Sequence, residues 1–364
     1  MMNTIRNAIL TLAFSMTGSA SAAGVSTLLE LAEIVVVGRS TLIARTEQGV
    51  SGSVRVERIL KGTVNQSSIA VEIPPFRKGA VALVRFDEEC GMWFLLPIGG
   101  GKWGPVSKQP GSAYFPLPTC SEVNSFGLTL SMPLADRIAL ELASAAESFH
   151  GGRRYAGDLY SIFGGVAPAA KSKVAARFVT SQNPDLLATG LALQIQNQDP
   201  GALRRMEVEA GLFAKSDARS GLYRAVSTYR SPLPVGVHVL GRLATQSGPG
   251  PTAFLVGAAV EALVHIHTRE ALPYLMSLLD SAEALIRNRA VAGLSLFRLN
   301  IPANLSDKEL WGAVGAKLNP GLTTLTLKER EFIQLGGFAN PAEEMAHISF
   351  YKSWWLENRA RLGF

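Results

Sequence analysis

The sequence predicts an α+β protein in which a small antiparallel β-barrel or sandwich precedes an all-α solenoid. Residues 25–130 alternate between apolar and polar side chains at the strand period, and from residue 133 the period changes to that of an α-helix. Residues 255–266 also align with residues 286–297 at an offset of 31 without a gap, which indicates a repeat architecture. The expected parts are a signal peptide (1–22), a β-domain (23–130), helical repeats (131–346) and a C-terminal capping helix (347–364).

The strand prediction depends on short segments rich in β-branched and aromatic residues, separated by residues typical of turns. The expected strands are 34–44, 51–62, 68–74, 80–89 and 92–99. Glycine, proline and serine dominate the residues that follow, 99–112, and predict a loop. Within that loop Gly99, Gly100 and Gly101 are expected to form a hairpin turn or a bulge, because no phosphate-loop lysine–serine pair follows them.

The first residues have the pattern of a secretory signal. Arg6 gives a positive start, residues 8–16 form an uncharged and largely apolar run, and Ala20 and Ala22 are small residues suited to cleavage after position 22. No later run is apolar for the roughly 20 residues that a membrane-spanning helix needs. We therefore expect a periplasmic or secreted protein without a transmembrane segment in its mature chain.

The chain contains two cysteines, Cys90 and Cys120. Two cysteines in an exported chain form a bridge more often than not, so a disulfide is expected, with two buried thiols as the alternative. They are not arranged as a C-x-x-C motif, which argues against thiol–disulfide catalysis.

The helical half is expected to consist of short helices joined by polar or proline-containing links. The apolar spacing predicts helices at 133–148, 173–179, 186–196, 221–230 and 235–244. Residues 269–297 then predict two helices with a polar turn between them. In that turn, Asp280 is positioned to cap the second helix, with Glu283 three residues later as in a capping box.

Residues 269–297 resemble a HEAT repeat of the short type, with about 31 residues per unit. The first helix carries Ala271-Leu272-Pro273 followed by leucines, and the second carries Ile286, Arg287, Ala290 and Leu294. The resemblance implies an α-solenoid over about 130–300. It also implies that Arg287 supports the packing between repeats.

The β-half is similar to netrin-like, inhibitor-type OB barrels found in exported bacterial proteins. The matching stretches are AEIVVVGRS (32–40), VRVERILKG (54–62), IAVEIP (69–74) and GAVALVRF (79–86). Inhibitors of that group reach a catalytic metal through an N-terminal cysteine, which this chain lacks, and an inhibitor role is accordingly in doubt.

The residues that could carry chemistry form no linear motif of a known active site. His265 and His267 are two positions apart, so on a helix they point about 200° apart and do not share a metal ion. His265 is expected beside the core and His267 in a loop. We therefore expect no catalytic residues, no metal and no cofactor, and a protein that is not an enzyme. The alternative is an enzyme or enzyme inhibitor with a site at the junction of the two halves, near 97–120.

The positive charge of the chain is concentrated in residues 150–231, where eleven Lys and Arg face six Asp and Glu. The pairs Arg153-Arg154 and Arg204-Arg205 contribute most, with Lys171, Lys173 and Arg177. One interpretation is a surface for an acidic partner or an anionic envelope surface, and the other is an ordinary solvated helical face. Nucleic acid is not expected as a partner, because an exported chain is separated from the nucleic acid of the cytosol.

The C-terminal segment 348–364 places Trp354 and Trp355 with two other aromatic residues on a short basic helix. Its expected role is to close the exposed core of the last repeat, and the alternative is an aromatic hot spot for a partner. Taken together, the sequence favours an exported interaction or scaffold protein that binds another protein through a helical-repeat surface. We therefore take Arg153, Arg154, Arg204, Arg205, Trp354 and Trp355 as the partner-binding candidates.

Overall fold

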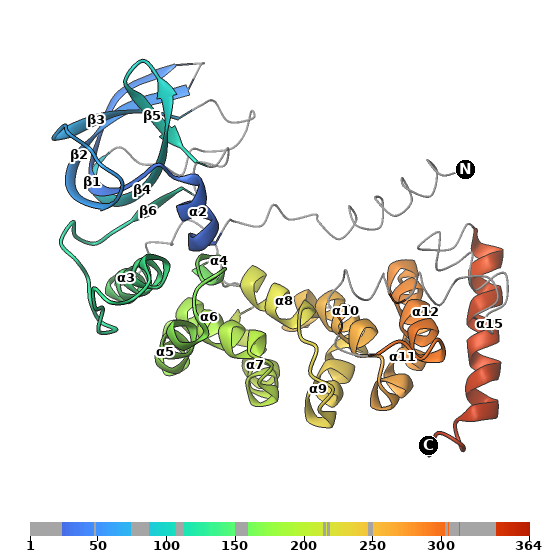
Figure 1. Cartoon of the computed structure of the whole chain (residues 1–364). Helices are drawn as coiled ribbons and strands as arrows, with labels where there is room; N and C mark the ends of the chain where they lie inside the picture. The colour runs from blue at the N-terminus through green and yellow to red at the C-terminus, as the bar shows by residue number, and fades with distance from the viewer. Residues whose placement is uncertain are drawn as a thin grey trace. The chain divides into compact units, whose positions relative to one another are not determined.

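The computed structural model consists of a β-barrel followed by helices, which confirms the predicted α+β class (Figure 1). It describes residues 24–46, 49–73, 87–106, 113–149, 159–213, 216, 219–246, 250–302, 305, 313 and 340–364. The change from strands to helices falls between residues 116 and 134. Packing divides the chain differently, into one compact unit that ends at Leu193 and another that begins at Gln194. The signal peptide predicted for 1–22 lies outside the described residues.

The barrel is a closed ring of five strands, and a short sixth strand pairs with one of them. The strands are β1 (Ile34–Thr46), β2 (Gly49–Lys61), β3 (Ser68–Ile73), β4 (Asp87–Gly99), β5 (Lys102–Pro105) and β6 (Tyr114–Pro116). Their order is β1-β2-β3-β5-β4, and β1 also pairs with β4, which closes the ring. An odd number of strands cannot close with every neighbour antiparallel, and here β3 and β5 are the parallel pair.

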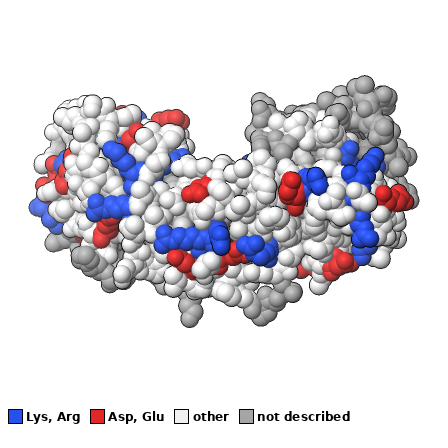
Figure 2. All heavy atoms as spheres, turned by 90° about the horizontal axis from the view of Figure 1, so that it is seen from below, with Lys and Arg blue, Asp and Glu red and all other residues white. Residues whose placement is uncertain are grey.

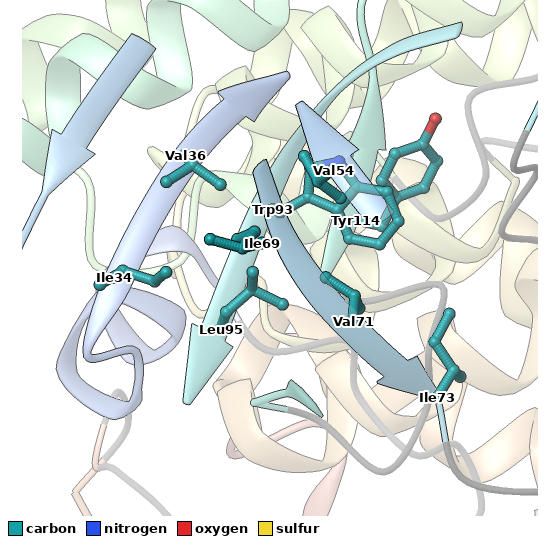
Figure 3. Packing of buried hydrophobic residues seen from close by; sticks show 9 residues of the cluster. All are labelled: Ile34, Val36, Val54, Ile69, Val71, Ile73, Trp93, Leu95 and Tyr114. Carbon is teal, nitrogen blue, oxygen red and sulfur yellow. The ribbon is translucent and has the colours of Figure 1, made fainter. Parts of the chain in front are cut away.

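Side chains that alternate inward along these strands form the barrel core (Figure 3). The core residues are Ile34, Val36, Val54, Ile69, Val71, Ile73, Trp93, Leu95 and Tyr114. Trp93 packs against Tyr114 of β6, with 4.4 Å between the ring centroids. The short strand β6 therefore contributes a large aromatic side chain to the core.

Three features of this half differ from the prediction. Residues 102–105 are strand β5 although they fall in the predicted loop. The reason is that Gly100 and Gly101 have positive φ angles of 61° and 72° and return the chain beside β4 in a two-residue turn. Strand β4 is continuous across the break predicted at 90–91, whereas 80–86 lie outside the described residues.

The third difference is a helix, α2 (Val25–Leu31), in a segment predicted to be extended. Val25, Leu28 and Leu29 are its buried residues, and that spacing is helical. Lys61 Nζ at the end of β2 donates hydrogen bonds to the carbonyl oxygens of Leu29 and Ala32, at 2.5 and 2.6 Å. The cation thus satisfies carbonyl groups that the C-terminus of a helix leaves without partners.

The disulfide between Cys90 of β4 and Cys120 is present, as predicted. It closes a loop over 30 residues of sequence that includes β5 and β6. We expect replacement of both cysteines by alanine to lower the free energy of unfolding by about 3 kcal/mol, because the unfolded chain regains loop entropy. Urea unfolding measures the change, and chemical reduction of the wild-type protein should reproduce it. An unchanged unfolding midpoint after both treatments would contradict the expectation.

The unit that ends at Leu193 also contains helices. Besides α2, its described helices are α3 (Leu134–Ser148), α4 (Leu159–Ile162), α5 (Pro168–Phe178) and most of α6 (Pro184–Gln196). The helices predicted at 133–148, 173–179 and 186–196 are confirmed as α3, α5 and α6.

The second unit contains helical hairpins stacked in two layers. Its described helices are α7 (Pro200–Phe213), α8 (Arg219–Ser227), α9 (Pro234–Ala244), α10 (Val256–Ile266), α11 (Leu272–Leu278), α12 (Ala284–Arg298) and α15 (Pro341–Asn358), with short 3-10 turns η2 (Ala253–Leu255) and η3 (Arg269–Ala271). In one layer α9 contacts α7 and α11, and in the other α10 contacts α8 and α12 (Figure 1). The expected helix–turn–helix at 269–297 is confirmed as α11 and α12. The proposed cap is not, because Glu283 is the N-cap of α12 without a side-chain hydrogen bond, and Asp280 instead accepts from Lys352.

Candidate functional site

Three helices of the second unit carry the same buried pair, alanine followed by valine. The pairs are Ala225-Val226 in α8, Ala259-Val260 in α10 and Ala290-Val291 in α12, and all six residues are fully buried. The small alanine allows close approach between neighbouring helices, and the valine fills the layer between them. The pairs are therefore equivalent positions, and they extend the repeat to α8, which the gap-free alignment of the sequence did not reach.

A side chain in the turn after α6 bonds to the turn after α8, and a side chain in the turn after α10 bonds to the turn after α12. Gln198 has a left-handed φ of 66°, and its side-chain oxygen accepts hydrogen bonds from the backbone N–H groups of Arg230 and Ser231, at 2.6 and 2.8 Å. His267, with a φ of 27° after α10, places Nε2 2.9 Å from the carbonyl oxygen of Ile301 in the turn after α12. Each side chain thus contacts a turn that lies more than thirty residues later.

His267 is therefore a buried structural residue. Its Nδ1 lies 2.9 Å from the carbonyl oxygen of Val264, so both ring nitrogens face backbone carbonyls. His265 is also buried. Among the residues that the structure describes, no group of three His, Cys, Asp or Glu side chains could hold a metal ion.

The outer surface of α7, α9 and α11, called here the α7–α9–α11 face, combines exposed apolar and basic residues. Arg204, Val208 and Leu212 follow one another at four-residue spacing, so they share one stripe of α7. Val208 is 78% exposed and Leu212 is 57% exposed, and Arg204 is exposed as well. The stripe therefore presents two apolar side chains to solvent, one turn apart and beside an arginine.

Two polar contacts join the three helices across this face. Arg242 of α9 donates to both carboxylate oxygens of Glu207 on α7, at 2.9 and 2.6 Å, and this hydrogen bonding raises the pKa of Arg242. His238 Nδ1 lies 3.0 Å from the hydroxyl of Tyr274 on α11. The contacts fix the register of the helices and keep the surface in one arrangement.

Of the two basic candidates on α7, one is already paired. Arg205 forms an ion pair with Glu209 one turn later, at 3.0 Å, and this exposed pair is worth less than about 1 kcal/mol. Arg204 has no ion-pair partner among the described residues. Figure 2, viewed from the side on which α7, α9 and α11 lie in Figure 1, shows acidic and basic residues interspersed. Arg153 and Arg154 lie outside the described residues.

The aromatic candidates at the C-terminus lie on α15, which packs against α11 and α12. Trp354 contacts Phe297 of α12, with 6.3 Å between ring centroids. Trp355 contacts Phe364, at 5.3 Å. Both tryptophans are half-buried, so each has an inner surface that packs and an outer surface that is accessible.

No family model, curated protein or solved structure matches this chain. The geometry of the described residues is therefore the basis for the functional proposal. No described helix combines the length and the apolarity needed to cross a bilayer.

Sequence reasoning found Arg204 and Arg205 from the charge count but missed the apolar stripe beside them. No helix was predicted at 200–213, and neither Val208 nor Leu212 was singled out. An apolar pattern alone also does not say which of two adjacent stripes a neighbouring helix covers. The buried stripe of α7 is the one with Leu203, Met206 and Ala210. A signal was available in the sequence, since α7 has apolar residues on more than one face.

Proposed function

We propose that this chain is an exported interaction or scaffold protein of the cell envelope, which binds a partner protein through the α7–α9–α11 face. The observation that carries the proposal is the exposed stripe of Arg204, Val208 and Leu212 on a surface held in register by cross-helix contacts. Burial of exposed apolar side chains would favour association, and Arg204 offers a charge to an acidic residue of the partner.

The helical half is best assigned to repeats of the HEAT type. The hairpin of α11 and α12, the shared alanine–valine pairs and the stacking of the two layers support this assignment. Arg287 also fits its expected packing role, because it bonds Glu344 of α15 at 2.6 Å and the carbonyl oxygen of Ser281 at 2.7 Å. Such stacks present long surfaces, which suit the binding of another protein.

The barrel half is assigned to the netrin-like, OB-type group on its five-strand closed ring. The disulfide supports export, because such bonds persist in oxidising compartments. Periplasmic or secreted localisation thus belongs to the proposal together with the signal peptide at 1–22.

The test replaces Val208 by aspartate in the full chain and captures partners by crosslinking in the periplasm. We expect recovery of the partner to fall at least tenfold, because a buried carboxylate would be left without a partner at the interface. The free energy of unfolding should change by less than about 0.5 kcal/mol, since the position is exposed.

Leu130→Asp is the matched control, because it makes the same kind of change at a residue that is 86% exposed and far from the repeat face in sequence. It should leave capture unchanged. Equal capture by Val208→Asp and the wild-type protein would overturn the proposed binding face.

A further inference from the structure

Helix α15 has an exposed surface that is unlike that of an ordinary capping helix. It packs on α11 and α12 at the end of the second unit (Figure 1). The outer face of a capping repeat is normally polar, because it meets water. On α15, however, Met345 is 60% exposed and Leu356 is 66% exposed. Neither belongs to the buried face of this helix, which is formed by His347, Ile348 and Tyr351.

The exposed apolar residues of α15 share one stripe with two basic residues. Met345, Lys352, Leu356 and Arg359 follow one another at spacings of seven, four and three, which place them on the same side of a helix. Lys352 and Arg359 are exposed as well. This α15 outer stripe therefore presents apolar and basic side chains together over about 21 Å, at 1.5 Å per residue.

Aromatic rings lie at the C-terminal end of the stripe. The exposed Phe364 packs on the half-buried Trp355, with 5.3 Å between the ring centroids. The guanidinium of Arg269, from η3, lies 5.2 Å from the centre of the Phe364 ring and donates to the carbonyl oxygen of Gly363, at 3.2 Å. These contacts hold Phe364 beside the helix with part of its ring open to solvent.

The charge around the stripe is positive. Lys352 is neutralised by Asp280, at 2.5 Å. Arg359 and Arg361 are exposed, and neither forms an ion pair with a described residue; Arg361 donates only to the side-chain oxygen of Asn358, at 2.8 Å. Glu357, two residues before Arg359, points to another side of the helix. Two guanidinium charges therefore remain without a counter-charge beside exposed apolar side chains.

This combination favours an anionic lipid surface over a second copy of the chain. A second copy would bring the same two uncompensated guanidinium groups to the contact, and like charges oppose association. A lipid surface offers acyl chains to apolar side chains, an interfacial layer to aromatic rings and phosphates to arginine. Such a contact needs no pocket, because the side chains enter the lipid.

We propose that the α15 outer stripe, together with Phe364, docks on the surface of an anionic phospholipid membrane. Met345 and Leu356 would enter the boundary between headgroups and acyl chains, and Arg359 and Arg361 would contact lipid phosphates. The inner face of α15 stays packed on α11 and α12, so docking is compatible with a capping role. The stripe shares no residue with the α7–α9–α11 face and does not depend on the function proposed for that face.

The test is sedimentation of the full chain with vesicles made of equal amounts of phosphatidylglycerol and phosphatidylcholine. The wild-type protein should bind these vesicles at least tenfold more tightly than vesicles of phosphatidylcholine alone, and its affinity should fall as salt is added. Leu356→Asp should weaken binding at least tenfold, because it removes an apolar group and adds a negative charge. Its melting temperature should stay at the wild-type value, since the position is exposed.

Val208→Asp is the matched control, because it makes the same kind of change at an exposed apolar residue of α7. It should bind the vesicles as the wild type does, whereas Leu356→Asp should leave partner capture unchanged, so the two variants separate the two surfaces. Replacement of both Arg359 and Arg361 by glutamine should weaken binding about 25-fold, because each basic residue near an anionic surface contributes roughly a fivefold factor.

Wild-type protein that does not sediment with the phosphatidylglycerol vesicles would overturn the proposal, and so would equal binding by the wild type and Leu356→Asp. Equal binding to both kinds of vesicle would overturn the assignment to an anionic surface. Sedimentation equilibrium without lipid tests the other occupant. A wild-type dimer that Leu356→Asp converts into a monomer would assign the stripe to a second copy of the chain instead.

Discussion

Replacing Arg58 by alanine is expected to lower the free energy of unfolding by about 3–5 kcal/mol. Arg58 lies on β2 and forms an ion pair with Glu141 of α3, whose side chain is only 4% exposed. Its Nε also donates to the carbonyl oxygen of Cys120, at 2.7 Å. Removal of the guanidinium would leave a buried carboxylate without its counter-charge and a carbonyl without its donor, and both losses are costly.

Arg55→Ala is the matched control, since Arg55 lies on the same strand, is 65% exposed and pairs with Glu57. Its loss should cost less than about 1 kcal/mol, because water screens an exposed pair. Urea unfolding of Arg58→Ala and Arg55→Ala measures the two losses in free energy of unfolding. Equal small effects would show that the Arg58 contacts contribute little to stability.

A double replacement separates charge from packing. Arg58→Met with Glu141→Leu removes the buried charge along with its partner, so most of the stability should return relative to Arg58→Ala alone. If the double variant is as unstable as Arg58→Ala, the contribution of Arg58 is specific to its hydrogen bonds rather than to the avoidance of an unpaired carboxylate.

The strands and helices with strong periodicity could be predicted from the sequence, because each buries one face. Strand β5 could not, since its four residues, Lys102–Pro105, form a strand through the glycine turn that precedes them. Helix α2 was missed because a seven-residue segment with apolar residues at 25, 28 and 29 offers too little length to tell one period from another. The parallel pairing of β3 with β5 follows from closure of the ring, which no local pattern reveals.

The contacts between the helices of the second unit were harder to predict, because they join residues that lie far apart in the sequence. Tyr223, Gly257 and Arg289 become neighbours only when three helices are stacked, and the spacing between their alanine–valine pairs changes from 34 to 31 residues. A search for one fixed offset of 31 residues aligns α10 with α12 and misses the match between α8 and α10. Asp280 illustrates the reverse error, because local spacing suggested a helix cap, while its contact is with Lys352 of α15.

Helix α15 provides the other large expected effect, since Tyr351→Ala should lower the free energy of unfolding by about 3–5 kcal/mol. The Tyr351 side chain is fully buried, and its hydroxyl lies 2.5 Å from the Ser295 hydroxyl of α12. Arg298 of α12 lies 6.0 Å from the centre of the same ring. Loss of the Tyr351 side chain would open a cavity between α12 and α15. Thermal or urea unfolding would detect the loss of stability.

Trp355→Ala distinguishes a cap from a contact site for a partner, because Trp355 is half-buried and packs on Phe364 near the end of the chain. If α15 acts only as a cap, Trp355→Ala should lower stability by less than Tyr351→Ala does and leave partner capture unchanged. If Trp355 belongs to a hot spot, capture should fall while stability stays nearly the same. The cap role would be contradicted if Tyr351→Ala unfolded at the wild-type midpoint, since a buried aromatic side chain that covers the hairpin of α11 and α12 cannot be removed without cost.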